Sequence, residues 1–359
     1  MTDPIRKPEE PGAESLLACP LPLRRYPAIT LAHGSGGRLT GLLIDELFRP
    51  VFQSPTLEQR HDGARLTLGG ARLAFSTDSY VVRPLFFPGG DIGELAATGT
   101  ANDLTMCGAR PRYLSCGLIL EEGLPMEALV RVVRSLKRAA DAAGLEVACG
   151  DTKVVERGKG DGVFITTTGV GVVRPGMELS GRCAKPGDVI LVSGTLGDHG
   201  MAIMAERESL GFESPIVSDT AALHGLIEAM RASGADLHVL RDPTRGGLAT
   251  TLNEIAKQSG VGMMLQEKAL PVTPAVEAAC EFLGLDPLYV ANEGKLVAIC
   301  AEQDAEKLLA AMQAHPLGAQ AAIVGSVHAD EHHFVQMTTA FGGRRIVDWL
   351  SGEQLPRIC

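Results

Sequence analysis

The feature that most constrains this chain is the alternation of short apolar runs with stretches of helical periodicity from Ile29 onwards. Four runs rich in β-branched or apolar residues end at glycine, proline or charge, which predicts strands at residues 71–77, 113–120, 145–149 and 162–173. A helix is predicted between two of them, because Pro125 suits a first helical position, apolar residues recur at helical spacing, and Gly144 suits the position after the end. The alternation predicts an α/β (α+β) fold.

A cluster of prolines and glycines at residues 174–187 interrupts this pattern and predicts a domain boundary. A second set of elements follows it, with strands predicted at 188–193, 262–266 and 295–300 and helices at 220–232, 247–258, 274–283 and 305–315. We therefore expect four segments: a flexible N-terminal extension over 1–28, a first domain over 29–175, a second over 185–335, and a C-terminal tail over 336–359.

Composition excludes several classes of protein. The chain of 359 residues has 45% hydrophobic and 21% charged residues and a net charge of −10, which favours filled cores and offers no electrostatic footprint for nucleic acid or an anionic membrane. Its eight cysteines include no CxxC pair, so neither a zinc site nor a disulfide framework is indicated. Residues 1–28 lack the apolar stretch of a signal peptide, and no later run is long enough to span a membrane; both observations predict a cytoplasmic protein.

A glycine-rich turn, His33-Gly34-Ser35-Gly36-Gly37, is followed directly by a helical pattern over 39–48. Glycines let backbone amides approach phosphate oxygens, and a helix N-terminus adds partial positive charge, so the turn is a possible phosphate cradle. The motif matches neither GxGxxG nor the P-loop, and a glycine turn without a ligand is at least as common.

Aspartates recur at the ends of apolar strands or in glycine-flanked turns, at Asp62, Asp78, Asp103 and Asp151. Carboxylates that converge at strand ends suit Mg²⁺ shared with the phosphates of a nucleotide, whereas a single aspartate is more often a turn or cap residue. Lys153 opens a charged, glycine-containing segment that suits closure over phosphate or a solvated hairpin equally. Asp242 and Arg245 in RDPTRGGL resemble an anion-facing turn.

The last residue is a cysteine, Cys359, which places a thiol at the tip of the tail. From Ser351 to this thiol, nine extended residues sweep about 30 Å. Pro356 cannot continue a helix and favours extended geometry at Leu355. Extended geometry suits a segment that threads into a cleft. Arg357 favours the thiolate and the adjacent carboxylate disfavours it. The alternative is an ordinary disordered terminus.

Together, HGSGG, TDSYVV, ANDLTMCGA, CGDTKVV, SGTLGDHG, RDPTRGGL, NEGK and the terminal PRIC resemble the HypE family of hydrogenase maturation factors. That family belongs to the superfamily of aminoimidazole ribonucleotide synthetase, selenophosphate synthetase and thiamine monophosphate kinase. The resemblance spans Ile29 to Cys359, and the PRIC ending distinguishes the HypE branch. It implies a two-domain PurM-like fold whose N-terminal domain binds ATP and forms a homodimer.

The resemblance also implies a reaction. A carbamoyltransferase partner, HypF, would load Cys359 with a carbamoyl group. ATP would then drive its dehydration to a thiocyanate, which supplies cyanide to the HypC and HypD complex for the iron of [NiFe] hydrogenase. Phosphorylation turns the amide oxygen into a good leaving group.

The implied roles are assigned residue by residue. Asp78, Asp103 and Asp151 resemble Mg²⁺-ATP ligands, with Asp62 as a fourth. Gly34, Gly36 and Gly37 would contribute amides near the phosphates, and Lys153 would neutralise phosphoryl charge. Glu293 would be the base that takes a proton from nitrogen, against the alternative of a salt bridge to Lys295. His199 is a weaker candidate, because a histidine at the start of a helix more often has a structural role.

Two other readings remain open. A small-molecule kinase or ATP-dependent ligase of the superfamily would use the same internal motifs. The cysteine at the terminus argues against it, and Cys19 lacks the neighbouring lysine of selenophosphate synthetases. A non-catalytic assembly protein would only dock its tail into a partner and would turn over no ATP. Without a ligand, we expect the tail to be disordered.

Overall fold

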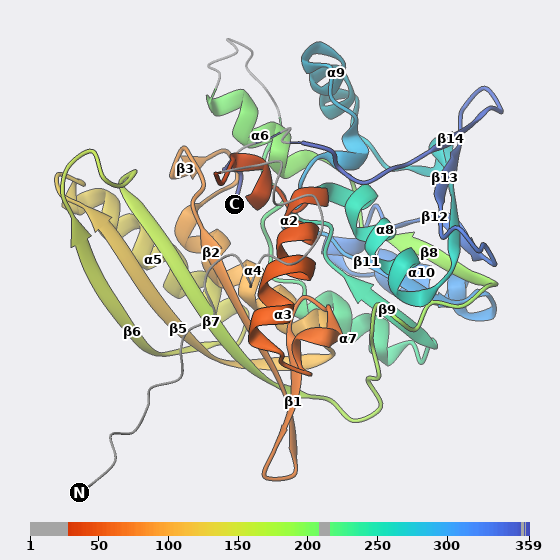
Figure 1. Ribbon diagram of the computed structural model, residues 1–359, viewed down its shortest axis with the longest axis horizontal. Coiled ribbons are helices and arrows are strands. Elements are labelled where there is room, and N and C mark those ends of the chain that lie inside the picture. The colour runs from red at the N-terminus through yellow and green to blue at the C-terminus, as the bar shows by residue number, and fades with distance from the viewer. Residues whose placement is uncertain (1–27, 208–215, 353–354, 356) are drawn as a thin grey trace, which may run out of the picture.

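A computed structural model describes residues 28–207, 216–352, 355 and 357–359, and shows two β-sheets, each with its own helices (Figure 1). The expected flexible extension lies, apart from Ala28, outside the described residues. Within the described part of the chain, no helix is long and apolar enough to cross a membrane.

The first sheet has five strands in the order β1-β2-β7-β5-β6. Their bounds are β1 Ala64–Leu68, β2 Ala71–Tyr80, β5 Ala109–Glu121, β6 Glu146–Val155 and β7 Val163–Val173. Neighbouring strands are antiparallel except for the parallel pair β5 and β6, which the helix α5 (Met126–Ala142) connects. The four predicted strands and the predicted helix are confirmed. A two-stranded ribbon, β3 (Phe86–Phe87) with β4 (Gly90–Asp91), follows β2.

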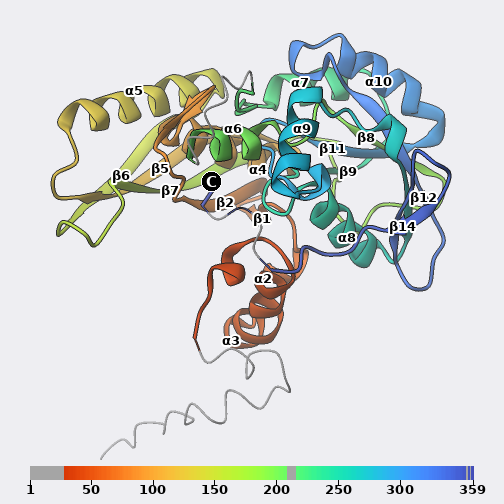
Figure 2. The same cartoon turned by 90° about the horizontal axis from the view of Figure 1, so that it is seen from above.

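Two helices cover one face of this sheet, and no helix of the described residues covers the other face (Figure 2). One is α5, which buries Val132, Leu136 and Ala140 and turns its arginines outward. The other, α4 (Ile92–Met106), is buried on nearly all sides. A helix without a polar face lacks the periodic pattern that reveals helices in a sequence, which explains why α4 was not predicted.

The second sheet has seven strands in the order β14-β13-β10-β12-β8-β11-β9. Their bounds are β8 Asp188–Val192, β9 Leu237–Arg241, β10 Gly262–Gln266, β11 Val297–Ala301, β12 Ala322–His328, β13 Val335–Thr338 and β14 Arg344–Ile346. Its helices are α6 Asp198–Arg207, α7 His224–Ala232, α8 Gly247–Ser259, α9 Pro274–Leu283 and α10 Ala305–Gln313. Short 3₁₀ turns are η2 Leu31–Gly34, η4 Leu57–Gln59, η5 Glu267–Ala269, η6 Pro287–Tyr289, η7 Glu302–Asp304 and η8 Pro316–Gly318.

The predicted strands and helices of the second domain are present, but the expected end of that domain at residue 335 is too early. Strand β13 pairs in parallel with β10, and β14 pairs with β13. Val347 and Leu350 are buried beyond them. The tail that leaves the domain therefore begins at Ser351.

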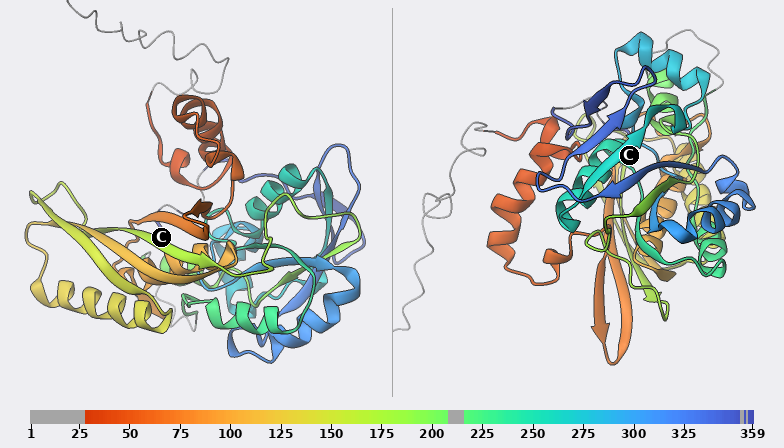
Figure 3. Two further views of the ribbon diagram at one scale, coloured as in Figure 1. Left: turned by 90° about the horizontal axis from the view of Figure 1, so that it is seen from below. Right: turned by 90° about the vertical axis from the view of Figure 1, so that its right-hand side faces the viewer.

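A helical segment near the N-terminus lies apart from both sheets (Figure 3). It runs continuously through α2 (Arg38–Leu43), the π-helical turn η3 (Ile44–Phe48) and α3 (Arg49–Phe52), so the helix expected at 39–48 is confirmed. It begins directly after the glycine-rich turn.

Candidate functional site

The described residues of the tail do not extend away from the molecule but lie against the first domain, beside the end of β2. The Val81 N–H donates to an α-carboxylate oxygen of Cys359 (3.0 Å), and the Arg83 N–H donates to the Arg357 carbonyl oxygen (3.3 Å). The Ile358 side chain is buried and belongs to the core of the first domain. The structure thus differs from the expected disorder, because backbone hydrogen bonds and an apolar anchor together hold the tail.

Charged side chains add to this docking. The Arg357 guanidinium forms an ion pair with Asp161 and donates to the Val81 carbonyl oxygen (3.0 Å). Arg207, the last residue of α6, donates to the carbonyl oxygens of Arg83 (2.7 Å) and Arg357 (2.8 Å). Arg357 is therefore engaged in holding the tail and is not the cation that acts on the thiol.

The Cys359 thiol faces a cavity of about 160 Å³ between the two domains. The cavity is lined by the glycine-rich turn, the end of β2, the RDPTRGG turn and the tail, with Gly34, Ser79, Val81, Arg245, Ala291 and Cys359 among the lining residues. Burial raises the pKa of Cys359 to about 12, against the opposing charge of Arg245, with smaller upward contributions from Glu293 and Asp78. The docked thiol is neutral at pH 7 and therefore a poor nucleophile.

The glycine-rich turn borders the cavity, but most of its amides already have partners. The Gly36 N–H donates to the Thr40 hydroxyl (3.0 Å), and the Arg38 N–H donates to the Leu350 carbonyl oxygen (3.0 Å). A Cβ at Gly36, whose φ is +77°, would lie 2.8 Å from the Arg245 Cβ, and one at Gly37 would lie 2.5 Å from the Leu350 oxygen. These two glycines allow close packing against the RDPTRGG turn and the start of the tail. Gly34, in contrast, lines the cavity.

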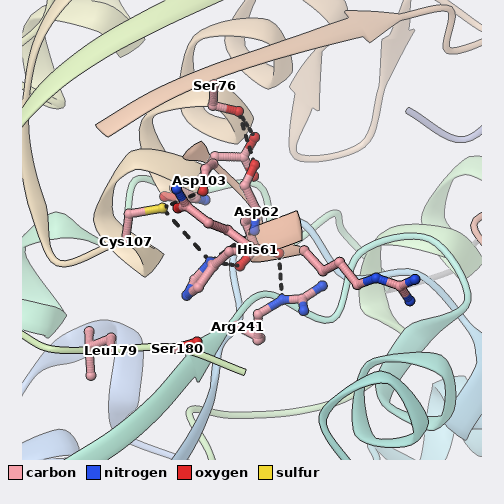
Figure 4. A network of polar contacts seen from close by, with 12 residues as sticks. His61, Asp62, Ser76, Asp103, Cys107, Leu179, Ser180 and Arg241 are labelled. Atoms are coloured by element: carbon pink, nitrogen blue, oxygen red, sulfur yellow. Dashed lines mark hydrogen bonds and ion pairs between the residues drawn. The ribbon is translucent and has the colours of Figure 1, made fainter. Parts of the chain in front are cut away.

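Three of the four predicted aspartates form a crowded acidic cluster with Asp242, and Figure 4 shows its buried part. Asp103 accepts a hydrogen bond from Ser76, and Asp62 pairs with the buried Arg241. The sequence suggested that Asp103 lies at a strand end or in a turn, but in the structure it lies within α4. Burial raises the pKa of Asp103 well above its usual value, and the charges of Asp242, Asp78 and Asp62 raise it further.

Asp242 was recognised in the sequence only as part of a turn, and it is a full member of this cluster. Burial raises its pKa to about 6, with Arg241 opposing the shift and Asp78 adding to it. Mutually repelling carboxylates in one place favour the binding of a cation.

Glu293 lies in the turn before β11, with its side chain only 3% exposed. Its Oε1 is buried and has no hydrogen-bond partner, and burial raises its pKa well above the usual value, with further contributions from Asp78 and Asp242. A Cβ at the next residue, Gly294, would lie 1.7 Å from the Asp219 carbonyl oxygen, so this turn requires glycine.

The alternative role of Glu293, a salt bridge to Lys295, is not what the structure shows. Lys295 instead pairs with Asp219 (3.2 Å) and Asp198 (3.8 Å). Asp219 also accepts a hydrogen bond from the Glu293 N–H (3.0 Å), which fixes the turn. The Glu293 carboxyl is therefore buried, and no ion pair to it is found among the described residues.

Asp151 and Lys153 lie away from this cluster. Both are in β6, so Lys153 belongs to a strand and not to a loop. They pair with each other (2.6 Å), and their side chains are 70% and 69% exposed. Asp151 is in register with Gly117, Thr166 and Ser79 across the sheet, which places its side chain on the uncovered face. Asp78 precedes Ser79 by one residue, so its side chain faces the opposite side of the sheet. One chain therefore does not bring Asp151 to Asp78 and Asp103.

Carboxylate oxygens that crowd together suit Mg²⁺, and the buried Oδ2 of Asp62, which lies 3.6 Å from the His61 Nδ1 and has no hydrogen-bond partner among the described residues, is an oxygen that such a cation could take. Among the described residues, however, no three His, Cys, Asp or Glu side chains are placed to hold a metal ion together. This arrangement fits a Mg²⁺ ion that takes one or two protein carboxylates and completes its shell with phosphate oxygens and water.

Sequence reasoning missed two residues that shape the site, Asp219 and Arg207, and it missed the contact of His199 with the tail. Asp219 and Arg207 lie on either side of the undescribed residues 208–215 and belong to no recognisable motif. His199 was taken as structural, and the structure places it in contact with the tail, where its Nε2 is 2.7 Å from the Ile358 carbonyl oxygen.

Comparison with known proteins agrees with this architecture. The N-terminal domain of AIR synthase related proteins matches residues 60–173, and their C-terminal domain matches residues 185–338. The carbamoyl dehydratase HypE of Azotobacter vinelandii is 63% identical over 335 residues, which cover 93% of this chain and 98% of that protein.

Two solved structures are similar throughout. HypE from a HypE–HypF complex superposes with a TM-score of 0.81 at 49% identity, covering 85% of this chain and 99% of that one. HypE in complex with ATP superposes with a TM-score of 0.78 at 52% identity, covering 92% and 100%. The predicted resemblance and the two-domain PurM-like fold are confirmed. The chain belongs to the carbamoyl dehydratase HypE family, within the AIR synthase related proteins.

Proposed function

We propose that this chain uses ATP to dehydrate an S-carbamoyl group on Cys359 to an S-cyanate, which supplies the cyanide ligands of the [NiFe] hydrogenase iron. The observation that carries the proposal is the docked tail, which presents the Cys359 thiol to a cavity beside the acidic cluster and Glu293. Relatives named carbamoyl dehydratase HypE support the reaction, and a related structure in complex with ATP supports the nucleotide.

The chemistry is divided between two steps. In the first, the carbamoyl oxygen attacks the γ-phosphoryl group of ATP, ADP leaves, and the nitrogen gives up one proton. In the second, phosphate leaves as the nitrogen gives up its second proton, and S–C≡N remains. Glu293 is placed to accept a proton, since its buried Oε1 has no hydrogen-bond partner among the described residues. Burial of the cavity by the tail keeps water from competing for the activated carbon.

Loading of the thiol requires a different position of the tail. In the docked state, burial raises the pKa of Cys359 to about 12, so little thiolate is present for attack on a carbamoyl donor. We infer that the carbamoyltransferase HypF loads the tail outside the cavity and that the neutral thiocarbamate then docks. A related structure of a HypE–HypF complex supports this partner. HypC and HypD would accept the cyanide, in the cytoplasm.

We further propose that Asp78, Asp103, Asp62 and Asp242 provide the acidic surroundings for Mg²⁺-ATP, with Gly34 beside the phosphates. Mg²⁺ would neutralise phosphate charge during transfer. The Asp78 side chain is 33% exposed and lies 3.9 Å from the guanidinium of Arg245, a residue that lines the cavity. It is therefore the member best placed to share a cation with a nucleotide.

Asp78→Asn is expected to weaken Mg²⁺-ATP binding by about tenfold to a hundredfold, as the loss of a charged metal ligand does. Isothermal titration with and without Mg²⁺ measures the change. Asp141→Asn, a carboxylate on α5 whose side chain is 58% exposed, is the matched control and should leave binding unchanged. Equal affinity of Asp78→Asn and the parent protein would remove Asp78 from the site.

We propose that the uncovered face of the first sheet is the surface through which two copies form a homodimer. Large apolar residues lie exposed on this face, among them Phe75, Tyr113, Ile119 and Val172. Lys153 and Asp151 lie on the same face, so a dimer would bury their ion pair. Their proposed roles, Lys153 beside the transferring phosphoryl group and Asp151 as a ligand of Mg²⁺-ATP, therefore depend on the dimer.

Tyr113→Asp places a charge on this face and is expected to convert the dimer to a monomer at micromolar concentration, since an unpaired charge inside an interface costs several kcal/mol. Light scattering coupled to gel filtration gives the mass. Val51→Asp, a similarly exposed apolar residue on α3, is the control. A dimer that survives Tyr113→Asp but not Val51→Asp would move the interface to the N-terminal helices.

A small-molecule kinase or ligase is less well supported, because in this chain Leu355, Ile358 and Cys359 of the tail line the cavity that a separate substrate would need. The direct test of the proposed function follows the mass of the C-terminal peptide after incubation with HypF, carbamoyl phosphate and ATP. It should rise by one carbamoyl group and then fall by one water, with the second change dependent on ATP. A carbamoylated peptide that persists with ATP present would refute the dehydration.

A further inference from the structure

His199 has both ring nitrogens engaged, one by the tail and one by the body of the protein. It lies in the first turn of α6 and is completely buried. Its Nε2 is 2.7 Å from the Ile358 carbonyl oxygen, and its Nδ1 is 2.8 Å from the Ser218 hydroxyl. A carbonyl oxygen only accepts hydrogen bonds, so Nε2 carries the proton and Nδ1 accepts from Ser218.

The surroundings fix the ring in this state. The Ser218 oxygen accepts from the Thr220 N–H (3.2 Å) and is 2.7 Å from the Thr220 hydroxyl, which leaves its own proton for His199. The Phe87 ring packs edge-on against the imidazole, with centroids 5.6 Å apart and planes at 89°. Burial lowers the pKa of His199, so the ring stays neutral. The orientation of its Nε2–H is therefore set before the tail arrives.

The contacts along the tail alternate between two sides. The Arg357 carbonyl oxygen and an α-carboxylate oxygen of Cys359 accept from the main chain at Arg83 and Val81, whereas the carbonyl oxygen of Ile358 accepts from His199. A tail displaced by one residue would present the wrong carbonyl to His199 and would place the thiol where Ile358 is buried. His199 therefore distinguishes the correct register from its neighbours.

We propose that His199 is a positioning residue, which sets the register of the C-terminal tail by donating from Nε2 to the Ile358 carbonyl and thereby places the Cys359 sulfur in the cavity. This role deepens the proposed function, because it concerns how the carried group reaches the reacting centre. The ring nitrogens of His199 bond to Ser218 and to the Ile358 backbone, so His199 acts on Cys359 through the tail.

The first test measures docking without any chemistry. Cys359 is alkylated with iodoacetamide in the absence of ATP and carbamoyl donor, and mass spectrometry of the peptide from Asp348 to Cys359 gives the rate. His199→Phe keeps a ring but removes the donor, and alkylation should become about tenfold faster, as expected when a buried hydrogen bond is lost. His199→Gln keeps an N–H at a similar reach and should stay within about threefold of the parent. His224→Phe, at the start of α7 and outside the residues that line the cavity, is the control.

The second test separates positioning from general damage. In single turnovers of carbamoylated protein, His199→Phe should lower the dehydration rate about tenfold with the KM for ATP within about twofold, and His199→Gln should restore most of the rate. If His199→Phe does not fold, Ser218→Ala serves instead. It frees the ring to turn, and alkylation should become about threefold faster.

Equal alkylation rates for His199→Phe and the parent, or equal rates for His199→Phe and His199→Gln, would overturn the proposal. Because alkylation requires neither ATP nor a carbamoyl group, it can respond to His199 even if the parent protein performs no dehydration. Failure of the positioning role and failure of the proposed function are thus distinguishable.

Discussion

Cys359→Ala is expected to abolish both mass changes of the C-terminal peptide, the gain of a carbamoyl group and the ATP-dependent loss of water. The reason is chemical: the sulfur is the atom that carries the group, and alanine offers no nucleophile. Because the thiol contributes little to the anchoring contacts, which come from the backbone and from Ile358, the variant should fold and dock as the parent does. Thermal unfolding midpoints within about 2 °C of the parent would show this.

The matched control is Cys149→Ala, which removes an exposed cysteine from β6. Cys149 is exposed in the single chain and lies outside the tail, so it reports modification that does not depend on the tail. Retained modification in Cys149→Ala together with its loss in Cys359→Ala assigns the carrier. Modification of another peptide in Cys359→Ala, followed by ATP-dependent loss of water there, would contradict the assignment.

The architecture was largely accessible from the sequence because most elements have one buried and one exposed side. The strands around β5 and β7 and the helices α5 and α8 have periodic patterns, and their bounds agree closely with the structure. Strand β14, with only three residues, Arg344–Ile346, and no buried side chain, has no such pattern. Its place at the edge of the sheet depends on pairing with β13, which is a tertiary effect.

The position of an aspartate near the end of a strand does not predict which face of the sheet its side chain occupies. Asp78 and Asp151 occupy similar positions in their motifs, yet a shift of one residue in register turns them to opposite faces of the sheet. The alternation of side chains along a strand decides this, but it becomes visible only once the pairing of four strands is known. The docking of the tail is equally tertiary, because His199, Arg207 and Asp161 are far from Ile358 in the sequence.

The charges around Cys359 are known only from the structure, because neither the motifs nor the topology shows which cation lies near the thiol. The sequence suggested that Arg357 acts on the terminal thiol, but in the structure Asp161 neutralises Arg357, and Arg245 is the cation that opposes the raised pKa of Cys359. Burial raises the pKa of Glu293, and the same carboxylates that favour a cation near Asp103 raise it further. One cluster can thus prepare a base and a metal site together.

Glu293→Gln is expected to slow dehydration by about a hundredfold to ten-thousandfold while leaving carbamoylation by HypF unchanged, since general-base catalysis contributes a factor of this size. The amide keeps the shape of the side chain but accepts no proton. Single turnovers of pre-carbamoylated protein, stopped at intervals and analysed by mass, give the rate. Glu277→Gln on α9 is the control, because its carboxylate is exposed and in the first turn of that helix.

The pH dependence provides an independent signature of the same group. Burial raises the pKa of Glu293 well above that of an ordinary glutamate, so the carboxylate that accepts the proton forms only as the pH rises through this raised value. The dehydration rate of the parent should therefore increase with pH, with a midpoint above about 4.3. Glu293→Gln should lose this rise and remain low throughout. A rise of equal size and midpoint in both proteins would assign the titration, and the base, to another member of the acidic cluster.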